Sequence, residues 1–205
     1  MDLRDALSQI SEIRQRMANE RTFRGFRATP AAISGVLAIV AAAIQPSLIP
    51  QPQQDIWRYL ALWSGVALLS VVGHAAGIIL RLQRTRDPLE RQATLLAIGQ
   101  FGPCLIAGLL VTVAVVEFAQ AEACMLPGLW CVLFSLGVFA SRRMLPPAVF
   151  WVGAHYLLAG VVVLARAQSE AAFSPWAMGV PFGFGQLLGA AILYWNLERP
   201  HAQQA

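Results

Sequence analysis

The chain has 205 residues, of which 57% are hydrophobic and only 13% are charged, with a formal net charge of +4. A soluble domain carries about twice that share of charged residues, so the composition argues against a water-soluble globular protein. The three cysteines form no Cys-x-x-Cys pair, which disfavours a thiol redox enzyme.

Residues 1–29 are predicted to form a cytoplasmic amphipathic helix followed by an interfacial segment. Leu3, Leu7, Ile10, Ile13 and Met17 recur at helical spacing between charged residues. This helix could pack on the protein's own loops, form a short coiled coil, lie on the membrane surface, or recruit a soluble cytoplasmic protein through residues 1–21. The Phe-Arg-Gly-Phe-Arg stretch at 23–27 suits a lipid headgroup region. We therefore predict contact with the bilayer and no nucleic-acid partner.

Six apolar segments follow, at residues 30–48, 56–82, 94–118, 123–141, 145–166 and 174–197. At 1.5 Å per residue, each is long enough to cross roughly 30 Å of hydrocarbon. The sequence thus predicts an all-α, polytopic integral membrane protein. Its six-helix transmembrane domain spans residues 30–197, and a cytoplasmic tail covers residues 198–205.

The distribution of arginine predicts the orientation of these segments. All fifteen basic residues are arginines, and with a cytoplasmic N-terminus thirteen lie inside and only Arg58 and Arg166 lie outside. Cytoplasmic loops carry the excess of basic residues in membrane proteins. Both termini are therefore predicted to be cytoplasmic.

The third and sixth segments contain residues that interrupt a plain apolar helix. The third has Gln-Phe-Gly-Pro at 100–103, and the sixth has Pro-Phe-Gly-Phe-Gly-Gln at 181–186. Broken transmembrane helices free backbone groups that can bind substrates. The placement of the two stretches also fits a 3+3 inverted repeat, in which the last three segments repeat the first three with the opposite orientation across the membrane. The candidate ligand contacts are Gln100, Pro103, Pro181, Gly183 and Gln186. The alternative is that two kinked helices pack closely through glycine.

Two histidines lie at similar depth in the second and fifth segments. His74 and His155 are roughly 12 and 15 Å from the inner ends of their segments, and small residues flank both. Two imidazoles in this arrangement could ligate the iron of haem b or bind a transition metal. The alternative is that each ring makes one interhelical hydrogen bond. We predict no cofactor and no metal, with haem b kept as the alternative.

Several stretches resemble a family of small bacterial polytopic inner-membrane proteins that has no known activity. They are residues 23–26, 125–130, 134–141 and 174–188, so the resemblance runs along most of the chain. It implies a multi-pass protein of the bacterial inner membrane, and it implies no activity and no binding residues.

The function predicted from these features is not enzymatic. It is the binding or transport of a small neutral or hydrophobic molecule at the kinked third and sixth helices. The sequence has neither an intramembrane serine protease motif nor a His-Glu-x-x-His motif, which disfavours a hydrolase. Two alternatives stay open: a membrane anchor or sensor that recruits a soluble partner through residues 1–21, and a bis-histidine haem-binding redox protein.

Overall fold

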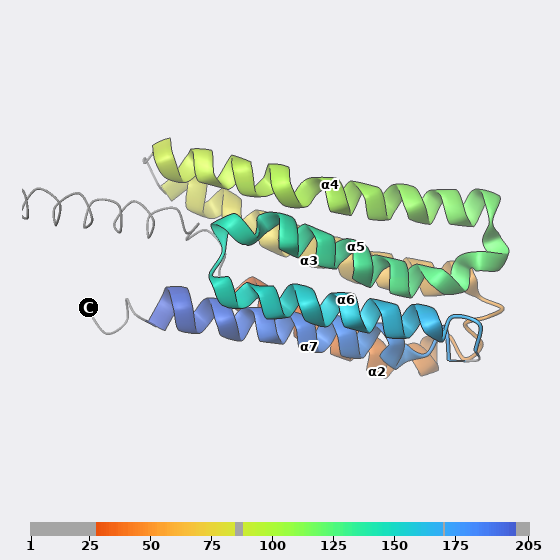
Figure 1. Ribbon diagram of the computed structural model, residues 1–205. Coiled ribbons are helices and arrows are strands. Elements are labelled where there is room, and N and C mark those ends of the chain that lie inside the picture. The colour runs from red at the N-terminus through yellow and green to blue at the C-terminus, as the bar shows by residue number, and fades with distance from the viewer. Residues whose placement is uncertain (1–27, 85–87, 170, 200–205) are drawn as a thin grey trace, which may run out of the picture.

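The computed structural model describes residues 28–84, 88–169 and 171–199, and these residues form helices and connecting turns with no strand (Figure 1). Within these ranges, six helices are long and apolar enough to cross a membrane. This confirms the predicted all-α, polytopic integral membrane protein. The principal helices are α2 (Ala28–Leu48), α3 (Ile56–Arg84), α4 (Pro88–Phe118), α5 (Leu126–Ala140), α6 (Phe150–Ala165) and α7 (Pro175–Leu193).

Short helical turns complete the spans. The 3-10 helix Gln120–Met125 runs directly into α5, and the two together form the span Gln120–Ala140. The 3-10 helices Ser141–Met144 and Pro147–Val149 connect α5 to α6, and the π-helix Tyr194–Glu198 extends α7. The predicted segments agree with the observed spans to within a few residues at either end. The segment predicted at 123–141, for example, is the span 120–140.

The prolines expected to interrupt two helices lie inside them. Pro103 is within α4 and Pro181 is within α7, and both helices continue past the proline. A proline removes one backbone hydrogen bond and crowds the preceding turn, but the turns on either side keep theirs. The predicted interruptions therefore do not divide either helix. The amphipathic helix expected within residues 1–21 lies outside the described residues, as does most of the predicted tail.

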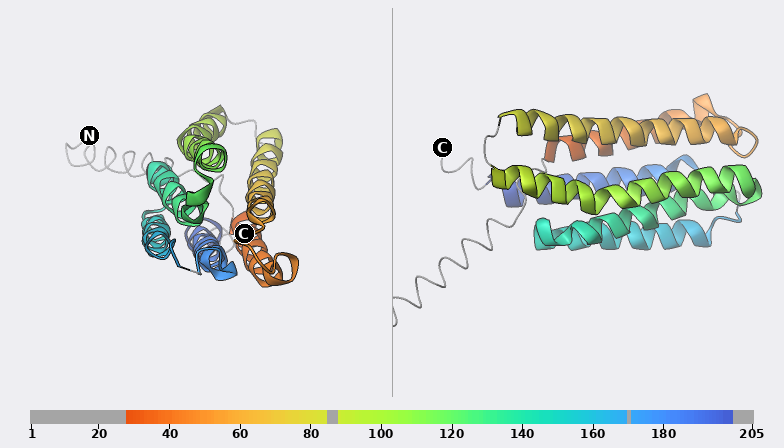
Figure 2. Two further views of the ribbon diagram at one scale, coloured as in Figure 1. Left: turned by 90° about the vertical axis from the view of Figure 1, so that its right-hand side faces the viewer. Right: turned by 90° about the horizontal axis from the view of Figure 1, so that it is seen from above.

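The six spans form a ring in chain order, which is visible when the bundle is viewed along its long axis (Figure 2). The first span, α2, packs against the last, α7, and this contact closes the ring. We call the end of the bundle where α2 begins and α7 ends the terminal end, and the other the far end. In the predicted 3+3 repeat, α2 corresponds to α5 and α4 to α7, so the contact between α7 and α2 would correspond to the contact between α4 and α5. Both contacts exist, and the repeat itself stays a prediction.

Small residues hold two helix pairs very close together. Between α2 and α7, a Cβ added at Gly179 would lie 2.4 Å from the Cβ of Ala42. Between α5 and α6, a Cβ added at Gly128 or Gly160 would lie 3.0 Å from the other glycine's carbonyl oxygen. Close approach of backbones over small residues is how helices associate in lipid, where no hydrophobic effect drives them together. These two pairs are the closely packed part of the bundle.

The helices α3 and α4 pack far less. In the most apolar stretch of either helix, only 6% of the residues are buried inside the protein. The corresponding share is 44% for the span 120–140. In α3 the buried side chains are Tyr59, Leu60 and Trp63, all near the far end. The remaining apolar side chains of α3 are mostly exposed, as expected for a helix that faces lipid.

Candidate functional site

An aromatic cluster lies where α4, α5, α6 and α7 meet. Phe134 of α5 is at its centre, with ring centroids 5.1 Å from Phe101, 4.7 Å from Tyr156 and 5.6 Å from Phe182. The Tyr156 and Phe182 centroids are 5.2 Å apart. Phe101 and Phe182 belong to the two stretches that the sequence singled out, so these stretches meet through Phe134. The helices α4 and α7 have α5 between them (Figure 2).

Tyr156 is the most deeply buried polar residue of this cluster. Its side chain has 0% exposure, and its hydroxyl has no hydrogen-bond partner among the described residues. The ring lies directly on Gly185 of α7, where an added Cβ would be 2.5 Å from the ring atom Cζ. The Gln186 side chain is close to the hydroxyl without forming a hydrogen bond of good geometry. A buried hydroxyl without a partner costs about 1–3 kcal/mol, so this group is notable in a folded protein.

Gln100 of α4 directly precedes Phe101, a member of the cluster. It is half-buried, and its Oε1 atom is buried without a hydrogen-bond partner in the described part of the chain. The following residues Phe101 and Cys104 pack against Gly137 of α5. Among the described residues, no hydrogen bond joins Gln100 to Gln186. Pro103, one turn further on, is exposed on the outer surface of the bundle.

Pro181 and Gly183 are buried in contacts between helices. A Cβ added at Gly183 would lie 2.6 Å from Ile39 Cγ1 of α2, so this glycine serves the close α2–α7 packing. The carbonyl oxygen of Pro181 accepts a hydrogen bond from His155 Nε2 at 3.1 Å. The three predicted site residues on α7 therefore have different roles: Pro181 accepts a hydrogen bond from His155, Gly183 packs on α2, and Gln186 approaches Tyr156.

The two histidines bind backbone carbonyls of different helices. His155 donates across to α7, whereas His74 Nδ1 lies 2.8 Å from Ser70 O of its own helix. A carbonyl oxygen only accepts, so each of these ring nitrogens carries the proton. The helices α3 and α6 have α5 and α7 between them (Figure 2). In this arrangement the two imidazoles do not face each other, and no group of three or more metal-ligating side chains occurs in the described residues.

The sequence interpretation did not identify a buried polar network at the far end. Gln45 of α2, which is 1% exposed, donates from Nε2 to Phe173 O at 2.9 Å. Its Oε1 atom accepts a hydrogen bond from Trp63 Nε1 of α3 at 3.0 Å. We call these three residues the far-end clasp. A glutamine within an apolar helix was the available signal, but an aromatic residue near a span end usually indicates the membrane interface, not a core contact.

Comparison of the chain with models of protein families, with curated protein sequences and with solved structures finds no match. The interpretation of the site therefore depends on its own geometry. That geometry offers uncharged hydrogen-bonding groups, Tyr156, Gln100 and Gln186, beside aromatic rings within a membrane-spanning bundle.

Proposed function

We propose that this integral membrane protein binds or transports a small neutral or hydrophobic molecule at the polar groups beside the aromatic cluster. The observation that carries the proposal is the Tyr156 hydroxyl, which is fully buried, has no hydrogen-bond partner in the described part of the chain and has the Gln186 amide close by. Buried polar groups are nearly always paired, and an unpaired one calls for an explanation such as a missing ligand. A molecule with one carbonyl or hydroxyl group would supply the missing hydrogen bond.

Among the described residues, the cluster has no charged member, which supports a neutral ligand. Its polar members are a phenol and two amides, and the nearest imidazole, His155, already donates to Pro181. Ionisable groups at mid-depth mark the pathways of ion-coupled transporters. Aromatic walls with a few hydrogen-bonding groups are instead typical of sites for small, mainly apolar molecules.

We also propose the bacterial inner membrane as the location, with both termini cytoplasmic. In the described bundle, Arg58 and Arg166 lie at the far end. The terminal end has Arg84, the last residue of α3, and Arg142 and Arg143 in the connection between α5 and α6. The resemblance to bacterial inner-membrane proteins and the excess of basic residues on cytoplasmic sides support this orientation.

The test of the proposed function is mass spectrometry of the small molecules that co-purify with the protein from its native membrane. We expect a molecule to co-purify with the wild type and to be lost from Gln100→Leu/Gln186→Leu. Tyr156→Phe should weaken its retention because only the hydroxyl is removed. Gln83→Leu is the matched control, since Gln83 is an exposed glutamine in the last turn of α3. Equal retention in all four proteins would contradict the proposal.

A further inference from the structure

The helices α2 and α3 touch near both ends and separate between them. At the far end, Trp63 Nε1 donates to Gln45 Oε1 at 3.0 Å. At the terminal end, a Cβ added at Gly77 would lie 3.7 Å from Pro30 Cγ, an ordinary van der Waals distance. Along either helix the two contacts are about 22 Å apart, at 1.5 Å per residue. The two helices therefore frame a gap.

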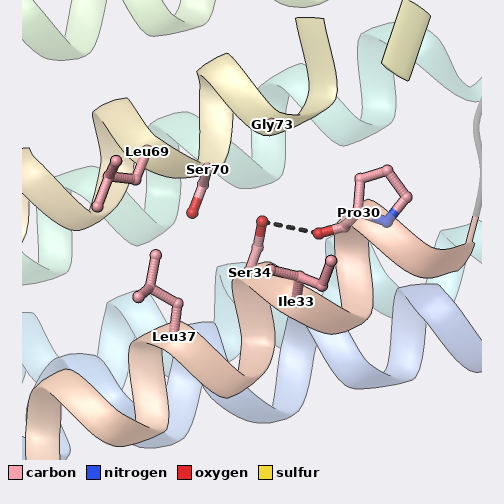
Figure 3. Close-up of a pocket in the computed structure, with 7 residues that line it drawn as sticks. All are labelled: Pro30, Ile33, Ser34, Leu37, Leu69, Ser70 and Gly73. Carbon is pink, nitrogen blue, oxygen red and sulfur yellow. Dashed lines mark hydrogen bonds between the residues drawn. The ribbon is translucent and has the colours of Figure 1, made fainter. Parts of the chain in front are cut away.

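A notch of about 90 Å³ occupies this gap on the side of the terminal end (Figure 3). Ser34 Oγ donates to Pro30 O at 2.9 Å, so its hydroxyl proton is already used. The Ser70 hydroxyl points from α3 toward α2 without a hydrogen bond to the other residues drawn in Figure 3. We call this notch the α2–α3 window. Its lining residues are Pro30, Ile33, Ser34, Leu37, Leu69, Ser70 and Gly73.

The window exists because no side chain fills it. Gly73 has no atom within 4 Å of an added Cβ, so α3 has open space at this position. The side chains at the rim face outward, with Ile33 62% and Leu69 61% exposed. The opening thus leads sideways out of the bundle, toward the surface that contacts lipid.

We propose that the α2–α3 window binds one acyl chain of a membrane phospholipid from the leaflet at the terminal end. The lining residues of α2 begin about 3 Å and end about 14 Å from the start of that helix, within the hydrocarbon depth. The lining has no charged group. The lining is apolar apart from the hydroxyls of Ser34 and Ser70, so it favours an apolar occupant over water.

Packing favours the chain in this position. Lipid tails are as apolar as the lining, so the gain comes from van der Waals contacts that an empty notch would lack. Filling a notch of about 90 Å³ with a chain adds these contacts along its whole lining. A chain in the window should therefore be retained more strongly than the lipid on the open faces of α3 and α4. This inference does not rest on the proposed function.

Photo-crosslinking in vesicles tests the proposal. The full-length protein would be reconstituted in phosphatidylethanolamine and phosphatidylglycerol with a trace of phospholipid that carries a diazirine in mid-chain. Peptide mapping should show adducts concentrated on the window residues of α2 and α3. Gly73→Leu should reduce these adducts by about tenfold because its side chain fills the notch. Gly65→Leu is the matched control, since an added Cβ there also meets nothing within 4 Å and Gly65 does not line the window.

Ser70→Leu fills the same notch from a second position and should reduce the adducts as Gly73→Leu does. Gel filtration and circular dichroism would show that the variants keep the fold. Two results would overturn the proposal. One is an even distribution of adducts over the exposed residues of α3 and α4, which indicates ordinary annular lipid. The other is unchanged labelling in both folded leucine variants.

Discussion

Replacing Gln45 by leucine should destabilise the far end of the bundle more than any other single polar substitution there. The Gln45 amide joins three parts of the chain: its own helix α2, Trp63 of α3, and Phe173 in the turn before α7. Leucine has a similar volume but offers no hydrogen-bonding group. The Trp63 N–H and the Phe173 carbonyl would then be left without partners in a region where Trp63 is 3% exposed.

The expected cost follows from the two hydrogen bonds of 2.9 and 3.0 Å. Interhelical hydrogen bonds in membranes contribute about 0.6 kcal/mol on average and at most about 1.7 kcal/mol each. A buried group left unpaired costs about 1–3 kcal/mol in soluble proteins. We therefore expect Gln45→Leu to lower the free energy of unfolding by about 2–3 kcal/mol.

A double-mutant cycle isolates the bond between the two side chains. Trp63→Phe alone should cost about 1–2 kcal/mol, and the double variant should cost about 1 kcal/mol less than the sum of the single changes. Reversible unfolding in mixed micelles of a mild detergent and sodium dodecyl sulfate provides the free energies. Strict additivity, or a Gln45→Leu protein within about 0.5 kcal/mol of the wild type, would refute this account of the far-end clasp.

Three further predictions concern packing, cofactor and orientation. Gly185→Ala should lower the free energy of unfolding by about 2 kcal/mol or more, because the new methyl group would overlap the Tyr156 ring. Gly189→Ala should be close to neutral in the same assay, because the nearest atom to its new methyl group is 3.9 Å away, on Val152. The protein purified from haem-replete cells should show no Soret absorption band, because the histidines of α3 and α6 do not face each other; a band lost on replacing either histidine by alanine would contradict this. In a background without native cysteines, a membrane-impermeant maleimide should label Gln54→Cys at the far end in intact cells and Gln83→Cys only after permeabilisation. The reverse pattern would invert the proposed orientation.

The spans were predictable because composition alone reveals a segment long and apolar enough to cross a bilayer. The 3-10 helix at Gln120–Met125 was only partly included in the predicted segment 123–141 because its polar residues resemble a loop, although it completes a span in which α5 alone has 15 residues. Helix contacts were harder to foresee. A membrane helix is apolar on every face, so hydrophobic periodicity does not distinguish a side that packs on protein from one that faces lipid.

The candidate site was predictable only where a polar residue interrupts an apolar run. Gln100 and Gln186 stand out in this way, and both lie near the aromatic cluster. Tyr156 did not stand out, because tyrosine commonly marks the membrane interface and its burial depends on Gly185 of another helix. The glycine at 183, selected as a helix breaker, instead lets Ile39 approach α7. Sequence thus identified the unusual residues, while their roles depend on which helices become neighbours.

The uneven packing of the ring indicates where the bundle opens most easily. Separating α2 from α7 would expose closely packed glycine backbones and lose the contacts of Gly35, Gly179 and Gly183. Moving the half of α3 nearest the terminal end disrupts far less, because the buried side chains among the described ones of α3 lie at the far end. The clasp at Gln45 and Trp63 would then act as the pivot, since it fixes α3 at one point.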